Sequence, residues 1–375
     1  MKIVADQNML MVDHFFGDFG PITYVPGRSL CAADVADADV LLVRSVTQVD
    51  QALLENSSVS FVGSATIGTD HIDQDYLTER GIAFAYAPGC NADAVVQYDL
   101  SVLSRVQPNW LQNTVGIVGC GNVGGRLYRA LTSLGVSCAV YDPFLDADSG
   151  FNLVDFESVL GSDVICVHTP LTTSGSHPTK HLFSAEVLAK IDPRSLLLNA
   201  GRGGVIDNVA LLALLESGSG LRVALDVWEG EPAISLALME KLLLATPHIA
   251  GYSVEGKARG TEMLAEAFKG LTDADEDTFT GQAKTLSKFS AVATVAAETL
   301  GELILSSYDV AQDDQRMRAE MASSSDLSLT FDQLRKQYPQ RHEFSCYKLS
   351  NRDLGENTTA AQAELRDQAL KLGFR

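Results

Sequence analysis

Three side chains suited to proton and anion chemistry each follow an apolar run in the second half of the chain. Arg202 stands in NAGRGG, Glu231 in DVWEGEP and His248 in TPHIAG. Short apolar runs bounded by Gly, Pro or Asp are typical of strands buried in a parallel sheet. Open α/β sheets bind ligands beyond the carboxyl ends of such strands, which is where we expect these side chains to lie.

Together these residues could oxidise an alcohol. His248 would accept the hydroxyl proton while the carbon gives its hydride to a nicotinamide, and Glu231 would orient the imidazole and favour its charged form. Arg202 would hold a neighbouring carboxylate and polarise the reacting oxygen. Each residue taken alone is more often structural, and Arg202 could simply be a surface residue of a glycine turn.

A glycine-rich turn predicts that a bound dinucleotide is the hydride acceptor. Gly119, Gly121 and Gly124 form GxGxxG between an apolar run and a helix-like stretch. The first glycine would permit a tight turn, the second would let a pyrophosphate reach the backbone, and the third would let helix and strand pack closely. Asp142 ends the next predicted strand, where it would bind the ribose hydroxyls and repel a 2′-phosphate. We therefore predict NAD rather than NADP, although Asp142 could also be a turn residue before Pro143.

Alternating strand-like and helix-like segments must position these residues. In the first hundred residues the predicted strands are KIVAD, ITYVP, DVLLVRS, VSFVGSA and IAFAYAP, separated by helices that include VDQALLENS and DQDYLTERG. A helix over 93–106 leads into a second β-α alternation, and a helix over 255–271 follows it. Parallel strands joined by helices predict doubly wound α/β domains.

The last part of the chain follows a different pattern. Helical stretches are predicted near 291–307 and 359–372, with a polar loop at 321–330. Some apolar residues could form a helix face for self-association, or could pack within their own domain: Val292, Val295, Leu300, Leu303 and Ile304.

Composition narrows the class of protein. The formal net charge of -20 disfavours nucleic acid and anionic membranes as partners, because polyanions would be repelled. The six cysteines form no CxxC pair and suit buried thiols in a reducing compartment, so we expect a cytoplasmic protein. The N-terminal residues lack the apolar core of a signal peptide, and no apolar run is long enough for a transmembrane helix.

Several other residues could be mistaken for functional ones. His177 and His181 have a metal-like spacing, but Pro178 lies between them and no third ligand is apparent, so we predict no metal site. His71 is expected to be a hydrogen-bonded structural residue. Cys90 is expected to be a packing thiol.

The motifs GIVGCGNVGG, NAGRGG, DVWEGEP and TPHIAG resemble those of the D-isomer-specific 2-hydroxyacid dehydrogenases. Further segments resemble the family members that oxidise 4-phospho-D-erythronate at C2 to 2-oxo-3-hydroxy-4-phosphobutanoate for pyridoxal 5′-phosphate synthesis. These segments are VPGR (25–28), VRSVTQVD (43–50), SATIGTDHID (64–73), APGCNADAVVQYDLSVL (87–103) and HPTKHL (177–182), with a C-terminal extension over 281–375. The resemblance covers essentially the whole chain.

The resemblance implies roles for particular residues. It implies Arg202 and Glu231 as active-site residues, His248 as proton donor and acceptor, and Ser45, Thr66 and Tyr252 as substrate contacts. Without it, Ser45 and Thr66 could only cap helices or close turns, and Tyr252 could be a packing residue. The implied NAD contacts, together with the glycines of the turn, are Gly119, Gly121, Asn122, Val123, Gly124, Asp142, Thr169, Gly201, Arg202, Gly203, Asp226 and Gly251.

Arg44 adds a prediction of its own. It stands beside Ser45, and a phosphorylated acid bound to a chain of this net charge needs a local cation. We therefore expect Arg44 to hold the phosphate or carboxylate end of the substrate.

The resemblance also implies the architecture. A Rossmann-type NAD domain over 93–256 would be inserted into a flavodoxin-like substrate domain made of 1–92 and 257–280, and 281–375 would form an α+β domain that makes a homodimer. The alternatives are another D-2-hydroxyacid dehydrogenase, of the phosphoglycerate or glycerate type, and a non-catalytic NAD-sensing protein on the same fold.

Overall fold

The structure, a computed structural model, describes residues 1–272, 291–350 and 359–375. The chain divides into two compact units, which are described separately below. The first contains Met1–Asn91 and Ser253–Ser290, and the second contains Ala92–Tyr252 and Ala291–Arg375. The predicted domain boundary at 280/281 falls outside the described residues.

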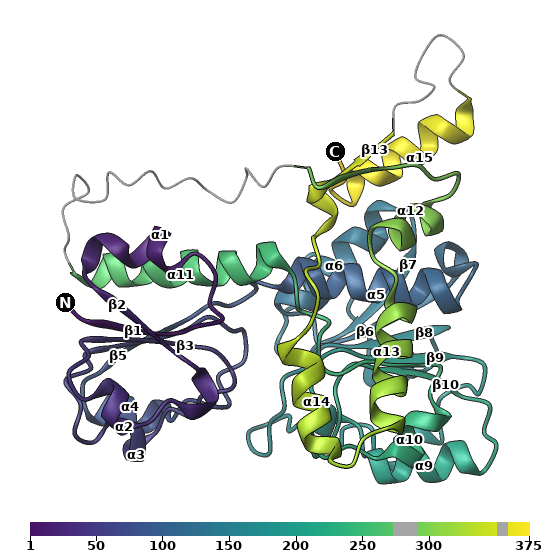
Figure 1. The fold of residues 1–375 in the computed structure, drawn as a ribbon. Helices are drawn as coiled ribbons and strands as arrows, with labels where there is room; N and C mark the ends of the chain where they lie inside the picture. The colour runs from purple at the N-terminus through teal and green to yellow at the C-terminus, as the bar shows by residue number, and fades with distance from the viewer. Residues whose placement is uncertain (273–290, 351–358) are drawn as a thin grey trace. The chain divides into compact units, whose positions relative to one another are not determined.

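The first unit is a parallel five-stranded sheet with helices on both faces, ordered β2-β1-β3-β4-β5. Helices α1 and α11 cover one face, while α2, α3 and α4 lie on the other (Figure 1). This strand order is that of flavodoxin-like folds, as predicted. The elements are β1 (Ile3–Asp6), α1 (Val12–Phe16), β2 (Ile22–Val25), α2 (Ala32–Val35), β3 (Val40–Val43), α3 (Gln51–Leu54), β4 (Phe61–Ser64), α4 (Gln74–Glu79), β5 (Ala83–Tyr86) and α11 (Val254–Thr272).

The second unit contains a parallel six-stranded sheet, ordered β11-β10-β9-β8-β6-β7. The strand order reverses beside β6, because β7 pairs on one side of it and β8 on the other. Ligands of open α/β sheets bind at such a switch point. The elements before the C-terminal segment are α5 (Ala92–Val106), β6 (Thr114–Val118), α6 (Asn122–Ser133), β7 (Ser137–Tyr141), α7 (Phe156–Leu160), β8 (Val164–Val167), α8 (Ala185–Leu188), β9 (Leu196–Asn199), α9 (Asn208–Glu216), β10 (Arg222–Leu225), α10 (Leu236–Lys241) and β11 (Leu244–Ala245).

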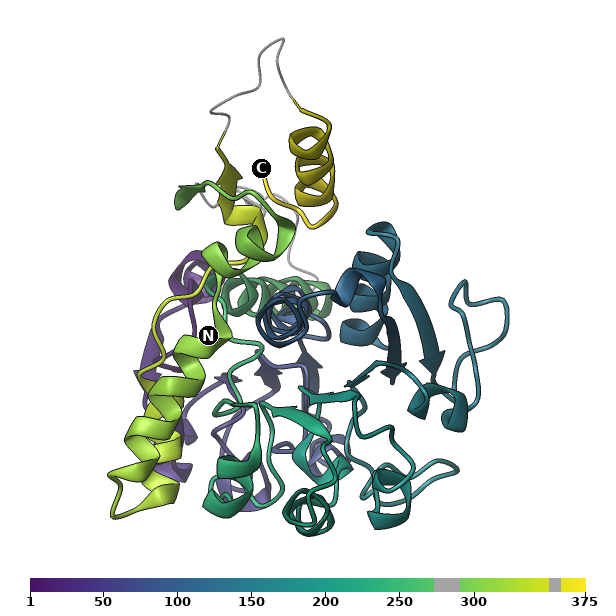
Figure 2. The same cartoon turned by 90° about the vertical axis from the view of Figure 1, so that its right-hand side faces the viewer.

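The C-terminal segment belongs to the same compact unit as this sheet. Helices α13 and α14 lie side by side, and α12 packs on α5 and α15 (Figures 1 and 2). The prediction of a separate domain over 281–375 remains a prediction. The elements are β12 (Ala293–Val295), α12 (Leu300–Ser307), α13 (Val310–Ala322), α14 (Leu327–Lys336), β13 (Tyr347–Leu349) and α15 (Ala360–Lys371).

Two predictions for this segment are wrong in detail. Residues 291–299 are not helical, because Ala293–Val295 forms a strand paired in parallel with β13. The predicted polar loop ends early, since α14 begins at Leu327 with Asp326 as its N-cap. An aspartate that accepts the free N–H groups of a first turn is a strong helix start.

The apolar residues proposed as a helix face for self-association do not form one. Leu300, Leu303 and Ile304 are buried in a cluster with residues of α5 and β6, and Val295 stands on strand β12. Val292 is exposed. The four buried residues therefore stabilise their own chain, and the homodimer prediction needs a different surface.

Candidate active site

The glycine-rich turn has the geometry expected of a phosphate-binding loop. Gly119 follows β6 in the left-handed region with φ 87°, and a Cβ on Gly124 would lie 2.0 Å from the carbonyl oxygen of Gly119. Helix α6 begins after Gly121 without a side-chain cap, so its first N–H groups have no side chain folded onto them. Free N–H groups at a helix N-terminus are a ready site for a pyrophosphate.

Asp142 sits where a ribose-binding carboxylate should. It follows β7, and its two carboxylate oxygens accept the N–H groups of Cys120, at 2.9 Å, and Phe144, at 3.1 Å. These bonds fix the carboxylate beside the glycine turn. Each oxygen keeps acceptor capacity for a ribose hydroxyl, since a carboxylate oxygen has more than one lone pair.

The ends of β8 and β9 complete this edge of the sheet. A Cβ on Gly119 would lie 2.9 Å from the backbone nitrogen of Thr169, and a Cβ on Gly201 would lie 3.1 Å from the Thr169 carbonyl oxygen. Gly203 lies against the backbone of Trp228. The Thr169 hydroxyl is buried and has no hydrogen-bond partner among the described residues. A buried hydroxyl without a partner is costly, and a bound polar ligand would satisfy it.

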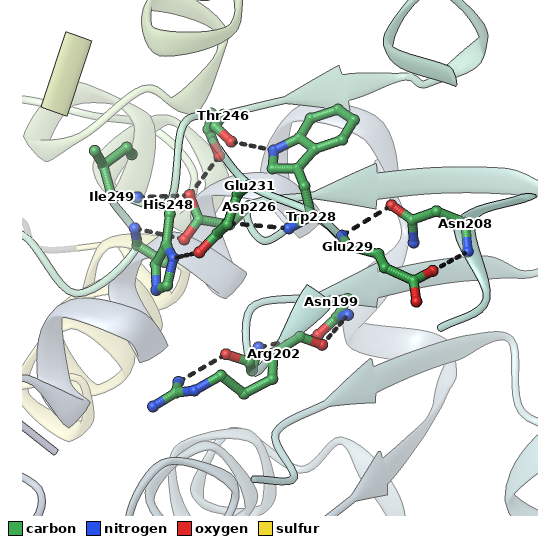
Figure 3. Close-up of polar contacts among 12 residues, drawn as sticks. Asn199, Arg202, Asn208, Asp226, Trp228, Glu229, Glu231, Thr246, His248 and Ile249 are labelled. Carbon is green, nitrogen blue, oxygen red and sulfur yellow. Dashed lines mark hydrogen bonds and ion pairs between the residues drawn. The ribbon is translucent and has the colours of Figure 1, made fainter. Parts of the chain in front are cut away.

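Asp226 is a buried anchor for the loop that carries His248. Its carboxylate accepts the Thr246 hydroxyl at 2.7 Å and the N–H groups of Ile249 and Ala250 at 2.8 and 2.9 Å (Figure 3). Burial raises the pKa of Asp226, although the charge of His248 and these hydrogen bonds oppose the rise. The backbone N–H of His248 also donates to the Asp226 carbonyl.

His248 and Glu231 form a close pair. Nδ1 of His248 lies 2.5 Å from Oε1 of Glu231 (Figure 3), and Oε2 of Glu231 accepts the N–H of Trp228 at 3.2 Å. Burial alone would raise the pKa of Glu231, but His248, Arg335 and the Trp228 N–H together hold it below its ordinary value. Glu231 therefore stays an anion, and Nε2 of His248 is the ring nitrogen left for a substrate proton.

The backbone of His248 is itself unusual. Its φ of 55° places it in the left-handed region, which costs a non-glycine residue about 1–3 kcal/mol. The hydrogen bonds to Asp226 hold this conformation. Strain of this kind clusters at functional positions.

Arg202 stands on the turn after β9. Asn199 fixes the turn by accepting the Gly201 N–H and donating to the Arg202 carbonyl, each at 3.0 Å. Figure 3 shows the Arg202 side chain extended to the same side of the strand ends as His248. The structure thus brings the predicted catalytic residues and Asp226 to one edge of one sheet.

The predicted substrate contacts fall in both units. Arg44 and Ser45 follow β3, and Thr66 follows β4, so they share the carboxyl edge of the first sheet. The Thr66 hydroxyl bonds to Ser64 at 2.7 Å and to the Gly68 carbonyl at 2.8 Å. Tyr252 belongs to the second unit, as does Gly251.

The other histidines that the sequence singled out have partners within the protein. Nε2 of His71 lies 2.9 Å from the Ser64 hydroxyl, and the ring is largely buried. His181 bonds Glu229 at 2.6 Å, and His177 packs edge-on against Phe144. Ligand atoms of His181, Asp207 and Glu229 lie within 4.8 Å of one another, close enough to share a cation, so the expected absence of a metal site remains a prediction.

Sequence reasoning missed a buried pair that joins α5 to the end of β8. Nε2 of His168 lies 3.1 Å from Oδ2 of Asp99, and both side chains are almost completely buried. Burial raises the pKa of Asp99, opposed by His168. The only sequence signal was a polar residue between the β8 run and Thr169, which does not reveal a partner on α5.

Comparison with known proteins agrees with this geometry. The chain is 48% identical over 365 residues to the erythronate-4-phosphate dehydrogenase of Teredinibacter turnerae, covering 96% of this chain and 98% of that one. It is 46% identical to the enzyme of that name from Cellvibrio japonicus, with 100% of each chain covered. The chain belongs to the erythronate-4-phosphate dehydrogenase family.

Parts of the chain also match family models, and solved structures share its fold. Residues 102–250 match the NAD-binding domain of the D-isomer-specific 2-hydroxyacid dehydrogenases, and residues 282–366 match a domain of unknown function. The fold resembles a D-lactate dehydrogenase from Aquifex aeolicus (TM-score 0.62, 20% identity, 75% of this chain and 98% of that one covered). It also resembles a 3-phosphoglycerate dehydrogenase from Entamoeba histolytica (TM-score 0.61, 22% identity, 76% of this chain and 99% of that one covered).

Family membership confirms several predictions. The protein is a dehydrogenase with an NAD-binding domain, as the glycine turn and Asp142 indicated. The predicted α/β architecture with a Rossmann-type domain is also confirmed. No helix in the described ranges is long and apolar enough to cross a membrane.

Proposed function

We propose that the protein oxidises 4-phospho-D-erythronate at C2 with NAD, giving 2-oxo-3-hydroxy-4-phosphobutanoate and NADH on the route to pyridoxal 5′-phosphate. The single observation that carries the chemistry is the His248–Glu231 pair at 2.5 Å beside the turn that bears Arg202. The full-length similarity to erythronate-4-phosphate dehydrogenases supports the substrate.

The residues have separate tasks in this reaction. His248 takes the C2 hydroxyl proton through Nε2, while Glu231 holds the ring through Nδ1 and balances the imidazolium that forms. Arg202 holds the substrate carboxylate and polarises the C2 oxygen. NAD, when bound, would supply the hydride acceptor.

The cofactor site uses the glycine turn and the neighbouring strand ends. Free N–H groups at the start of α6, with Asn122 and Val123, hold the pyrophosphate, and Asp142 holds the adenosine ribose. Thr169, Gly201, Gly203, Asp226 and Gly251 line the remaining edge. Arg44, Ser45, Thr66 and Tyr252 contact the substrate.

Two further parts of the proposal concern the protein as a whole. We propose a homodimer formed through the C-terminal segment; light scattering at micromolar concentration that gives a monomer would reject it. A cytoplasmic location is supported by six free thiols, five of them buried, which suit a reducing compartment.

The substrate is tested by comparing kcat/KM on 4-phosphoerythronate, 3-phosphoglycerate and glycerate. The catalytic residues handle only the hydroxy-acid core, so discrimination must come from elsewhere in the chain. We expect 4-phosphoerythronate to be preferred. Preference for another acid would indicate a related dehydrogenase, and intact NAD binding without turnover on any acid would indicate a sensor.

A further inference from the structure

The turns that carry Arg202 and Glu231 are joined to each other by hydrogen bonds outside the catalytic pair. The side-chain oxygen of Asn208, the first residue of α9, accepts the backbone N–H of Glu229 at 3.1 Å, and the Asn208 N–H donates to Oε2 of Glu229 at 3.3 Å (Figure 3). Glu229 stands two residues before Glu231. The segment that follows Arg202 is thus bonded to the segment that contains Glu231.

His181 bonds to both of these segments. Its backbone N–H donates at 2.8 Å to the carbonyl oxygen of Gly204, two residues after Arg202, and its Nε2 lies 2.6 Å from Oε1 of Glu229. An ionised carboxylate only accepts hydrogen bonds, so Nε2 is the donor. Nδ1 of the same ring lies 3.8 Å from Oδ2 of Asp207. Each oxygen of Glu229 therefore has a partner within the protein.

The backbone of His181 is strained in the same way as that of His248. Its φ is 53°, and within the described ranges the non-glycine residues with a positive φ are Met11, His181 and His248. A residue with a Cβ is unfavourable in this left-handed region. Both histidines bond to a glutamate of the same short segment, His181 to Glu229 and His248 to Glu231. Strain that is kept at the site of such a contact points to a task for the contact.

The two turns also touch directly, so that a displacement of Glu229 would be passed on to Glu231. A Cβ on Gly203 would lie 2.0 Å from the carbonyl carbon of Trp228, and the N–H of Trp228 donates to Oε2 of Glu231 at 3.2 Å. Oε1 of Glu231 in turn lies 2.5 Å from Nδ1 of His248. Contacts are thus continuous from Glu229 to the imidazole ring.

We propose that His181 is a positioning residue of the active site. Its hydrogen bond to Glu229 holds the turn of Glu231 at a fixed distance from the turn of Arg202. In the proposed reaction Arg202 binds the carboxylate of the acid, while His248 takes the proton of the hydroxyl on the adjacent carbon. The spacing of the turns therefore decides whether both groups are met at once. The inference rests on the proposed function for its effect on turnover, but not for its effect on the His248–Glu231 pair.

His181→Asn and His181→Gln separate the side-chain contact from the backbone conformation. Asparagine accepts the left-handed region more readily than glutamine, but its shorter side chain cannot reach Glu229, whereas the glutamine amide can donate from near the position of Nε2. We expect kcat to fall by about 10- to 100-fold in His181→Asn, with the Kd for NADH nearly unchanged, and His181→Gln to recover most of this loss. His177→Asn is the matched control and should equal the parent, because His177 is an exposed histidine of the same loop between β8 and α8.

Two kinetic results would overturn the proposal. One is an equal kcat in His181→Asn and the parent. The other is a kcat in His181→Gln as low as in His181→Asn or lower, since the backbone conformation and not the hydrogen bond would then matter.

A second readout does not depend on turnover. In protein labelled with 15N at the histidine rings, the His248 signals can be assigned from their loss in His248→Asn, and their chemical shifts report which ring nitrogen carries the proton. At a pH where the ring is neutral, we expect Nδ1 to carry it in the parent and in His181→Gln, because Glu231 accepts it. The loop of His248 is anchored separately by Asp226, so a displaced Glu231 would loosen this bond. We therefore expect a mixture of the two neutral forms in His181→Asn.

The ring signals also distinguish failure of this proposal from failure of the proposed function. An unchanged His248 ring in a folded His181→Asn variant that binds NADH would overturn the role of His181. A changed ring, with no oxidation of 4-phosphoerythronate by the parent, would instead reject the proposed substrate and leave the assignment of His181 intact.

Discussion

Nδ1 of His248 lies 2.5 Å from Oε1 of Glu231, and the second oxygen of Glu231 is tied to the backbone of Trp228. One imidazole nitrogen is thus bonded within the protein, and the proposed mechanism assigns the other to the substrate. The pair is joined to the sheet through Asp226, whose carboxylate holds the N–H groups that follow His248. The Glu231 carboxylate thus pairs with the imidazole ring, while the Asp226 carboxylate fixes the backbone of the loop.

Replacing His248 by Asn should remove the base and leave the cofactor site in place. We expect kcat to fall by about 10²- to 10⁴-fold, the range that a positioned general base contributes, with the Kd for NADH nearly unchanged. Stopped-flow turnover and fluorescence titration measure the two quantities. His14→Asn is the control, because His14 is exposed on α1. Turnover retained in His248→Asn would remove His248 from the mechanism.

Glu231→Gln should separate two effects of Glu231 on His248, the orientation of its ring and the negative charge beside it. The pKa of Glu231 is held below its ordinary value. Its contribution to the free energy of unfolding is therefore complete above about pH 4.3 and is lost as the pH falls through the lowered pKa. In the variant the anion that favours the imidazolium is absent. We expect a smaller loss of kcat than for His248→Asn, and an acid limb that moves to lower pH. An acid limb that moves to higher pH would contradict the assigned charge balance.

Asp142→Ala should weaken the preference for NAD over NADP. Loss of charge-assisted hydrogen bonds to a ribose costs about 1.5–3 kcal/mol, so NAD affinity should fall by roughly 10- to 100-fold. The 2′-phosphate of NADP would no longer be repelled by the Asp142 carboxylate. The ratio of kcat/KM values for the two cofactors measures this. Asp142 also accepts the Cys120 N–H, so damage to the glycine turn would weaken the binding of both cofactors equally. An unchanged ratio would therefore show that Asp142 does not select NAD over NADP.

Arg44→Ala should raise KM for the phosphorylated acid. One charge-assisted contact is worth about 1.5–3 kcal/mol, which corresponds to a loss of about 10- to 100-fold in kcat/KM. Arg80→Ala is the control, since Arg80 is an exposed arginine of the same unit that binds Tyr76 and the Glu55 carbonyl. Equal kinetics in Arg44→Ala and the parent protein would show that Arg44 does not hold the substrate.

Local patterns in the sequence were enough to predict several parts of this protein. Apolar runs located the strands because strands buried on both faces of a parallel sheet are continuously apolar. The glycine turn, Arg202, Glu231 and His248 could be found because each lies in a short motif that follows such a run, where parallel strands present ligand sites. The motifs also indicated the family.

Contacts between residues far apart in the chain could not be predicted in this way and become visible in the folded protein. Asp99 and His168 form a buried pair that no spacing reveals, and Arg335 and Tyr338 contact Tyr252 from more than eighty residues further along the chain. The same limit explains the errors near 291–307, where a strand paired with β13 replaced an expected helix. Contacts of this kind depend on packing between segments far apart in the chain, and packing overrides local propensity.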